Sequence, residues 1–456
     1  NEPLTGAAKA VDGRRELVGQ LAELVHAQAS AIADARPRSM VNRCGYHLSG
    51  VLEQGHLDLA KIVTGSEGTL ALITEATVRT QLLPRVRGVA LLFFDRLESA
   101  ATAALQVPPL GAVACDMMDR RLLSIARESD VRYDTLLPSS TEAMLLVEFH
   151  GDHVDDVRDS LDAVVSRLHR TEHLAFDART STDEEDIEFF WQLPRRVVPM
   201  LYRLRGSERP LPFVEDIAVP PSVLPEFVRR IQDTLKTHEV TASLFAHAGH
   251  GQLHLRPFLD LSNPAHQKLI VRLADDLYAA VFDVGGTISG EHADGLSRTR
   301  YVSRQYGKLY DTFREVKPIF DPHNIFNPGK VVGDDDSLLE KHLRRVGDPL
   351  PDALASAVTN GSVVSPQVES ARMRSEKPIT NSATSILTPL LDWSEAEAAA
   401  AARACNGCGH CRTYAPEARM CPIFRHVPAE EASPRAKGNL MRAVLTGQLP
   451  PEALAS

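Results

Sequence analysis

The chain of 456 residues is long enough for about three domains, and its 43% hydrophobic and 24% charged content is typical of globular protein. The formal net charge of −10 argues against a general nucleic-acid-binding protein, which needs a basic surface. No uncharged apolar run approaches the roughly 18 residues of a membrane span. The amino terminus has neither a signal pattern nor an initiator Met, which indicates the start of a fragment or of a processed chain.

The first two thirds of the chain predict a mixed fold. Apolar positions at helical spacing predict a helix over residues 14–35, and KIVTGSEGTLALITEATVRTQLLP (61–84) predicts a strand, a tight turn and a second strand. From residue 86 to about 260, strand-like segments such as GVALLFF (88–94) and AMLLVEFHG (143–151) alternate with helical ones. This order predicts an α+β or α/β fold, with an antiparallel sheet and covering helices as the favoured build.

The last third has a different composition. FDPHNIFNPGKVVG (320–333) is rich in Pro, Gly and Asn and closes the mixed region. Residues 334–390 are polar and predict a linker. The region 391–456 follows, and it holds four of the six cysteines.

The cysteines Cys405, Cys408, Cys411 and Cys421 predict a metal site in a reducing compartment. Three of them share one loop at the spacing that wraps one face of a cubane cluster, and a Cys-Pro pair follows. This pattern favours a 4Fe-4S cluster, and a structural zinc ion is the alternative. Cys421 either completes this site or serves a second cluster whose motif lies beyond the chain.

Histidines and a glutamate form a second candidate site. FAHAGHGQLHLRP (245–257) places His247 and His254 seven residues apart, which in an unbroken strand puts them on opposite faces. Gly249 and Gly251 break the strand, so a turn or bulge can bring both imidazoles to one cavity. Glu291 lies farther along in GGTISGEHADG, and two His with one Glu are a common set for a divalent metal. The metal alone is compatible with hydrolysis as well as with redox chemistry.

The motifs TGSEGTLALITEATVR, HAGHGQLH, GGTISGEH and FDPHNIFNPGKV occur in the same order as in FAD-linked oxidases of the vanillyl-alcohol oxidase type. With RPLPFVEDIAVP and CNGCGHCR, the chain resembles long bacterial proteins that join an FAD domain to an iron–sulfur domain, typified by D-2-hydroxyglutarate dehydrogenases. The resemblance implies four parts: the rear of an FAD-binding domain (1–85), an α+β substrate domain (86–333), the linker (334–390) and an iron–sulfur domain (391–456). It places the glycine-rich pyrophosphate loop before the start of this chain.

The resemblance also implies roles for individual residues. The residues implied to bind FAD are Gly65, Ser66, Glu67, Gly68, Thr69, Ile73, Thr74 and Asn327. The implied ligands of a divalent metal (Zn, Mn or Fe) are His247, His254 and Glu291. His292 matches the catalytic base and Arg195 the carboxylate-binding arginine, although here Pro194 stands at the usual arginine position. Val214 and Glu215 stand where relatives carry a lysine, which makes Arg205 and Arg209 candidates for the distal carboxylate clamp.

The implied activity is oxidation of a D-2-hydroxy acid, with D-2-hydroxyglutarate the first choice and D-lactate or glycolate the alternatives. The hydride would pass to FAD, and electrons would leave through the cluster to a quinone, a cytochrome or an electron-transfer protein. No nucleic-acid partner is expected. The expected location is the cytoplasm, with peripheral membrane association and a homo-oligomer left open. Two other classes remain: a metal-dependent hydrolase with a structural zinc tail, and a non-catalytic electron-transfer subunit.

Overall fold

The computed structural model describes residues 2–3, 12–202, 207–344, 398, 401–403, 405, 407, 409–413 and 421–454. These residues form two compact units, each described by itself. The first unit holds the described residues within Asn1–Val197, Leu211–Pro257 and Ile270–His342. The second holds those within Val198–Pro210, Phe258–Leu269 and Leu343–Ser456.

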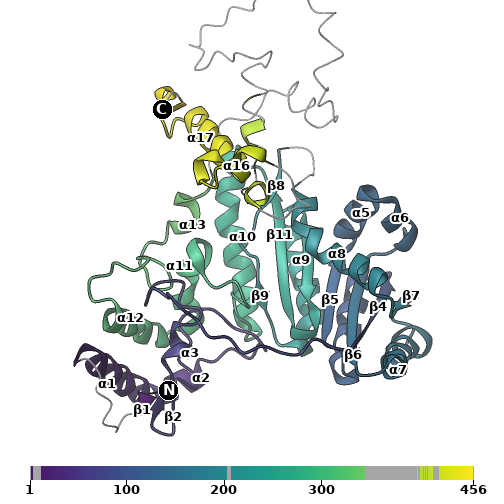
Figure 1. Ribbon diagram of the computed structural model, residues 1–456, viewed down its shortest axis with the longest axis horizontal. Helices are drawn as coiled ribbons and strands as arrows, with labels where there is room; N and C mark the ends of the chain where they lie inside the picture. Colours follow the sequence, from purple (N-terminus) through teal and green to yellow (C-terminus); the bar gives the residue numbers. More distant parts are fainter. Residues whose placement is uncertain are drawn as a thin grey trace, which may run out of the picture. The chain divides into compact units, whose positions relative to one another are not determined.

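An antiparallel sheet with the order β7-β4-β6-β5-β10-β11-β8 is the centre of the fold, and β9 pairs with β11 beside it (Figure 1). Its strands are β4 (Val86–Phe94), β5 (Ala114–Asp119), β6 (Ala143–Gly151), β7 (Asp177–Ser181), β8 (Arg209–Pro210), β9 (Ile217–Ala218), β10 (Ala242–His247) and β11 (Gln252–Leu259). A small sheet joins β1 (Glu2–Pro3), β3 (His56–Leu57) and β2 (Leu52–Glu53). The mixture of helices with an antiparallel sheet confirms the α+β class.

The single helix predicted over residues 14–35 is divided in two at Gln28, and further helices follow along the chain. The helices are α1 (Asp12–Ala27), α2 (Ala29–Asp34), α3 (Leu59–Val63), α4 (Leu97–Ala104), α5 (Arg120–Ser129), α6 (Val131–Leu136), α7 (Val154–Val165), α8 (Glu184–Leu201), α9 (Leu224–Thr237), α10 (Pro264–Asp283), α11 (Gly295–Tyr306), α12 (Leu309–Phe320), α13 (Leu338–Lys341), α16 (Pro422–His426) and α17 (Pro434–Leu445). The α13 helix falls in the predicted linker, most of which lies outside the described residues.

The core forms where α4 and α7 pack on β4 and β6. The predicted strands 88–94 and 143–151 lie in β4 and β6, and their apolar side chains are almost completely buried. Gly88 allows α7 to approach β4 closely, because a Cβ there would lie 2.4 Å from Val157 Cγ1. Burial of such side chains is the main stabilising term for this layer of the fold.

Of the strand, tight turn and strand predicted over residues 61–84, the turn is present, where the Thr69 amide donates to the Ser66 carbonyl, but both strands are wrong. The Asp58 carboxylate accepts hydrogen bonds from the backbone amides of Ala60 and Lys61, and this cap starts the helix α3 where a strand was expected. Residues 71–84 have no partner strand among the described residues and carry exposed apolar side chains such as Leu72 and Val78. β-propensity without a neighbouring strand does not make a sheet.

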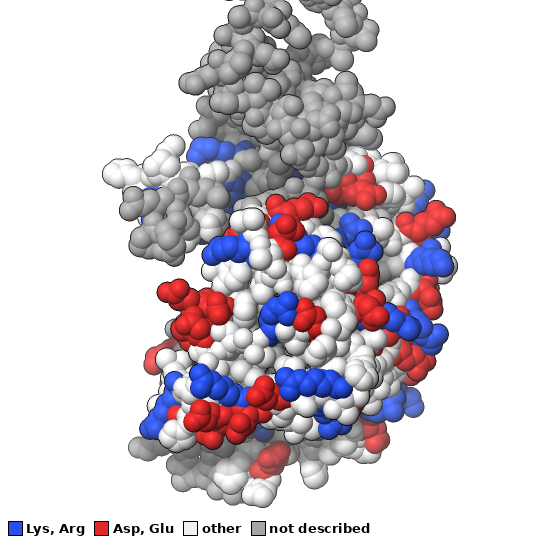
Figure 2. Space-filling model, turned by 90° about the vertical axis from the view of Figure 1, so that its right-hand side faces the viewer, with Lys and Arg blue, Asp and Glu red and all other residues white. Residues whose placement is uncertain are grey.

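The surface carries both signs of charge. Figure 2 shows Lys and Arg side chains interspersed with Asp and Glu over the face drawn there. No helix among the described residues has the length and apolar character needed to cross a membrane.

Candidate active site

A hairpin of β10 and β11 places His247 and His254 on one face of the sheet. In its register Phe245 lies opposite His254, and His247 lies two residues beyond Phe245 on the same face. The ring centroids of the two histidines are 5.2 Å apart. The hairpin turn needs Gly251, whose φ is +72° and where a Cβ would lie 2.2 Å from the Val219 carbonyl oxygen. The turn therefore resolves the odd spacing of the two histidines.

Asp216 holds the loop that carries Glu291 and His292. Its buried carboxylate accepts hydrogen bonds from the backbone amides of both residues, at 3.0 and 2.8 Å, and from the Gln252 side chain at 2.8 Å. A Cβ at Gly290 would lie 3.0 Å from the same carboxylate, so the loop passes close over it. Sequence reasoning missed this role of Asp216, although the residue lies within the quoted stretch VEDIAVP.

One oxygen of Glu291 faces three imidazoles. Glu291 Oε1 lies 3.6 Å from His247 Nε2, 3.4 Å from His254 Nε2 and 3.4 Å from His292 Nε2. The His254 imidazole and the other nearby histidines lower the pKa of Glu291 to about 2. The ligand atoms of His247, His254 and Glu291 all lie within 4.8 Å of one another. The structure thus brings together the predicted metal ligands, and a nitrogen-and-carboxylate set of this kind suits zinc or another divalent transition metal.

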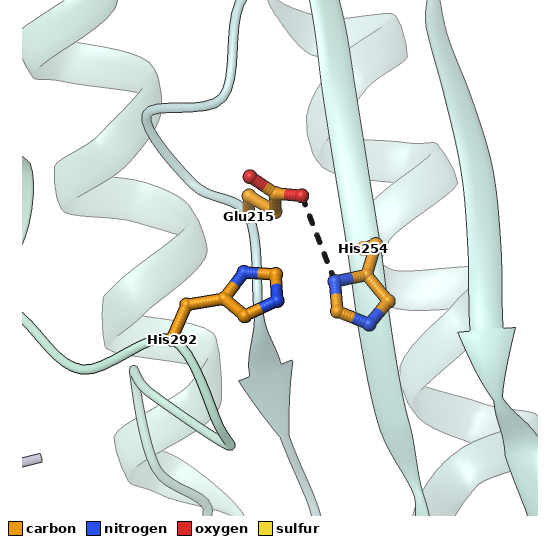
Figure 3. A group of neighbouring side chains, drawn as sticks. All are labelled: Glu215, His254 and His292. Atoms are coloured by element: carbon orange, nitrogen blue, oxygen red, sulfur yellow. Dashed lines mark ion pairs between the residues drawn. The ribbon is translucent and has the colours of Figure 1, made fainter. Parts of the chain in front are cut away.

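Buried carboxylates lie on the other side of the two histidines. Asp116, opposite His247 in the β5–β10 register, has Oδ1 2.8 Å from His247 Nδ1. Figure 3 shows Glu215 beside His254, with Glu215 Oε1 3.7 Å from His254 Nδ1 and the His292 ring nearby. Burial favours a neutral His254, but the carboxylates of Glu215 and Glu291 raise its pKa to about 9. The carboxylates of the cluster therefore favour a positive charge at this place, and a bound divalent cation would provide one.

Arg256 is a half-buried arginine that sequence reasoning did not single out. It lies two residues after His254 on β11, and its guanidinium pairs with the Glu215 carboxylate. Burial raises the pKa of Glu215, but the neighbouring His254 and Arg256 outweigh it, so the pKa lies below its usual value. Glu215 is therefore an ionised carboxylate between Arg256 and His254. Its position in VEDIAVP was noted only as a departure from the relatives.

A cavity of about 560 Å³ adjoins the cluster. His247, Glu291, Asp116, Trp191 of α8 and Arg43 are among its lining residues. This volume lies within the range of small-molecule sites in proteins. An organic acid of a few carbon atoms is small enough to enter it and reach the Glu291 cluster.

The predicted FAD-binding turn lies next to the same loop. The Glu67 carboxylate accepts hydrogen bonds from the backbone amides of Asp294 and Gly295, each at 2.8 Å. Asn327 donates to the Glu67 carbonyl at 2.8 Å, so this predicted residue joins the turn. Ser66 and Thr69 are buried within the turn. Gly68 has a φ of +67°, and a Cβ there would meet nothing within 4 Å, so its backbone is open to close approach.

Other predicted residues lie apart from this cluster. Arg195 pairs with Glu188 at 2.7 Å, two turns earlier on α8, and its side chain is 59% exposed. Ile73, 61% exposed, and its neighbour Thr74 lie in the segment 71–84 without regular structure. Arg209 belongs to β8 in the second unit, and Arg205 lies outside the described residues.

The cysteine region belongs to the second unit. Cys421 caps the amino end of α16, where its Sγ accepts a hydrogen bond from the Phe424 amide at 3.5 Å. Cys405 packs close to α17, where a Cβ on Gly438 would lie 3.4 Å from Cys405 Cβ. Cys405, Cys411 and Cys421 are free thiols, and Cys408 lies outside the described residues. An amide donor to sulfur is a usual feature of thiolate-held clusters.

Asp294 makes the stability of this region depend on pH. Burial raises its pKa from 3.8 to about 7, so the folded protein keeps this carboxyl protonated where the unfolded chain ionises it. Its contribution to the free energy of unfolding is therefore lost as the pH rises through this window, by about 4 kcal/mol in total. We expect Asp294→Asn to gain stability relative to the wild type between about pH 4.5 and about pH 8. Urea unfolding of both proteins at the two pH values tests this. A difference in the free energy of unfolding between the two proteins that is the same at both pH values would contradict it.

The model of the family described as "FAD linked oxidases, C-terminal domain" matches residues 83–331, more than half of the chain. The D-2-hydroxyglutarate dehydrogenase of Escherichia coli (strain K12) is 28% identical over 91% of this chain, which covers 38% of that protein. The chain thus spans less than half the length of this relative. The glycolate oxidase subunit GlcD of Bacillus subtilis (strain 168) is 27% identical over 61% of this chain and 58% of its own length.

The D-lactate dehydrogenase of Archaeoglobus fulgidus is 28% identical over 60% of this chain, which covers 58% of that protein. Among solved structures, p-cresol methylhydroxylase with bound substrate has a TM-score of 0.41 and 16% identity, over 55% of this chain and 53% of its own.

Proposed function

Since this chain belongs to the family of FAD linked oxidases through their C-terminal domain, we propose that it serves the FAD-dependent oxidation of a D-2-hydroxy acid, D-2-hydroxyglutarate in first place. The observation that carries the proposal is the Glu291 oxygen that faces His247, His254 and His292 at 3.4–3.6 Å beside a cavity. D-lactate and glycolate are the alternative substrates, because relatives named for them match 61% and 60% of this chain.

His247, His254 and Glu291 would hold a divalent metal, and the fit rests on their mutual distances and on the ionised state of Glu291. When bound, such a metal polarises the substrate's carboxylate and 2-hydroxyl oxygens and lowers the pKa of that hydroxyl. The cluster adjoins the cavity through His247 and Glu291, so the substrate oxygens would enter from that side. Trp191 and Arg43 would bound the rest of the acid.

His292 would accept the hydroxyl proton. Its side chain is 47% exposed, and its Nε2 lies 3.4 Å from Glu291 Oε1, so it borders the metal ligands and can pass the proton to water. An imidazole is the side chain best suited to take and release protons near neutral pH. The amides of Glu291 and His292 are tied to Asp216, which keeps the base at a constant place relative to the ligands.

The turn Gly65–Thr69 with Asn327 would border the flavin, which accepts the hydride from C2 when bound. The open backbone at Gly68 fits close approach of such a cofactor. Because Glu67 binds the amides of Asp294 and Gly295, the turn stays close to the loop that carries His292. The substrate carbon would then lie between the base and the flavin-side turn, as hydride transfer requires.

Cys405, Cys408, Cys411 and Cys421 would hold a 4Fe-4S cluster, which takes electrons one at a time towards an external acceptor. The fit rests on the amide that donates to Cys421 Sγ and on the free thiols of the described cysteines. A quinone, a cytochrome or an electron-transfer protein could be the acceptor. The predicted place of the protein is the cytoplasm or the inner face of the membrane.

An anaerobic visible spectrum of the FAD-loaded protein tests the proposal. D-2-hydroxyglutarate, D-lactate and glycolate are added in turn, and we expect flavin absorbance to bleach with D-2-hydroxyglutarate and not with its L-enantiomer. If only D-lactate or only glycolate bleaches the flavin, that acid is the substrate in place of D-2-hydroxyglutarate. Flavin absorbance that none of the acids changes would refute the proposed dehydrogenase activity.

A further inference from the structure

We propose that Asp116 and Glu215 are positioning residues that hold His247 and His254 with their Nε2 atoms free to bind the metal. The inference deepens the proposed function, because it rests on the metal site given there. It concerns two carboxylates from distant parts of the chain, β5 and the segment before β9, that meet the histidines on the side away from Glu291.

His247 shows the arrangement most directly. Its Nδ1 lies 2.8 Å from Asp116 Oδ1, and its Nε2 points to Glu291 Oε1 at 3.6 Å. Asp116 is 5% exposed, so its carboxylate has little access to water and is best satisfied by a donated Nδ1–H. With the proton on Nδ1, the lone pair of the neutral ring lies on Nε2, which is the atom that faces the cavity side of the cluster.

The His254 ring has the same arrangement, with Nδ1 towards a carboxylate and Nε2 towards Glu291, but its carboxylate is farther away. Its Nδ1 is a buried atom without a hydrogen-bond partner, and the nearest carboxylate oxygen, Glu215 Oε1, is 3.7 Å away. Its Nε2 lies 3.4 Å from Glu291 Oε1. Glu215 is itself fixed, because Arg256 pairs with its carboxylate and Arg298 donates to its backbone carbonyl. A carboxylate held in this way can orient the ring and set its tautomer.

Glu215, His254 and His292 could also be taken as a second metal site, since their ligand atoms lie within 4.8 Å of one another. The charges oppose this. The Arg256 guanidinium occupies the same Glu215 oxygen that faces His254, so a second divalent ion there would lie beside a fixed positive charge. The geometry points to one metal, bound through Nε2 of both histidines.

Asp116 should matter more than Glu215. Asp116 makes a direct hydrogen bond at 2.8 Å, whereas Glu215 stands at 3.7 Å and shares its charge with Arg256. Loss of such a partner typically weakens metal binding by about 10- to 100-fold. We expect Asp116→Asn near the upper end of this range and Glu215→Gln near the lower end.

The test is a titration of the chelator-treated full chain with Mn²⁺, followed by the electron paramagnetic resonance of the free ion. Mn²⁺ binds hard ligands such as carboxylates in preference to soft thiolates, so the cysteines do not obscure the result. Asp276→Asn is the matched control, since it removes a carboxylate from His238, a histidine outside the candidate metal ligands and the lining of the cavity. It should leave the Mn²⁺ affinity unchanged. In pulsed spectra of the loaded protein, the nitrogen modulation from coordinated imidazole should weaken in Asp116→Asn and persist in the control.

Affinities of both variants within twofold of the wild type would overturn the inference while leaving the metal site intact. Two Mn²⁺ ions per chain, with one lost in Glu215→Gln, would replace it with a dinuclear site. A wild-type chain that binds no Mn²⁺ would refute the metal site of the proposed function itself. Thermal unfolding of the metal-free proteins checks the fold, and if Asp116→Asn does not fold, Glu215→Gln decides the outcome.

Discussion

His254→Asn should abolish tight binding of the divalent metal and slow flavin reduction by about a thousandfold, because a Lewis-acid metal supplies several kcal/mol and each 1.36 kcal/mol is tenfold in rate. His254 would be the central ligand, because its Nε2 faces Glu291, its Nδ1 faces Glu215 and its side chain is 8% exposed. Stopped-flow absorbance of the flavin under anaerobic conditions, with excess D-2-hydroxyglutarate, measures the rate.

His238→Asn is the control for this substitution. His238 also pairs with a carboxylate, Asp276 at 2.7 Å, but it lies on no wall of the cavity beside the cluster. We expect it to reduce its flavin at the wild-type rate. A His254→Asn protein that reduces flavin as fast as the wild type would exclude a metal at this cluster from the reaction.

Cys405→Ser should remove the broad iron–sulfur absorbance completely and stop electron delivery to an external acceptor, while D-2-hydroxyglutarate still bleaches the flavin. The reason is that, in the proposed function, the iron–sulfur cluster would serve only the exit of electrons, whereas the oxidation would take place at the histidine cluster. Cys405 lies in the second unit and the histidines in the first. We therefore expect the substitution to affect acceptor reduction without affecting flavin reduction. Reduction of ferricyanide and of a quinone analogue measures the exit.

Cys44→Ala is the matched control, since Cys44 is a buried free thiol of the first unit. It should keep both the cluster absorbance and acceptor reduction. Persistence of full absorbance and of acceptor reduction in Cys405→Ser would refute the electron exit through this motif. Zinc in place of iron on elemental analysis would support a structural tail instead.

Much of the fold could be predicted from local patterns. The strands β4 and β6 are apolar runs bounded by turn residues, and α4 and α7 follow them with helical spacing. The two strands predicted within residues 61–84 are absent, because the Asp58 cap and the lack of a partner strand among the described residues outweighed the β-propensity of this segment. Helix capping and strand pairing depend on contacts with other residues, and the β-propensity of a segment carries no information about those contacts.

The candidate site was predictable only in part. His247, His254, Glu291 and His292 stand in recognisable motifs, and the structure brings their side chains together. Asp116, Glu215 and Asp216 were not predicted for this site, because nothing in their local sequence indicates which histidine or amide they meet. Arg195 was predicted from its neighbourhood in a motif, yet it pairs with Glu188 on the exposed side of α8.

By itself the sequence determined the chemistry that this protein can offer: two histidines and a glutamate for a metal, a glycine-rich turn, and a run of cysteines. It also determined the main strands and helices, because their periods depend on residues close in the chain. Only the tertiary structure decided that the hairpin turn places His247 and His254 on one face. It also decided that two carboxylates distant in the chain meet their Nδ1 atoms, Asp116 at His247 and Glu215 at His254. The physical reason is that strand register and side-chain contacts between distant segments depend on how the whole sheet packs, which no local pattern contains.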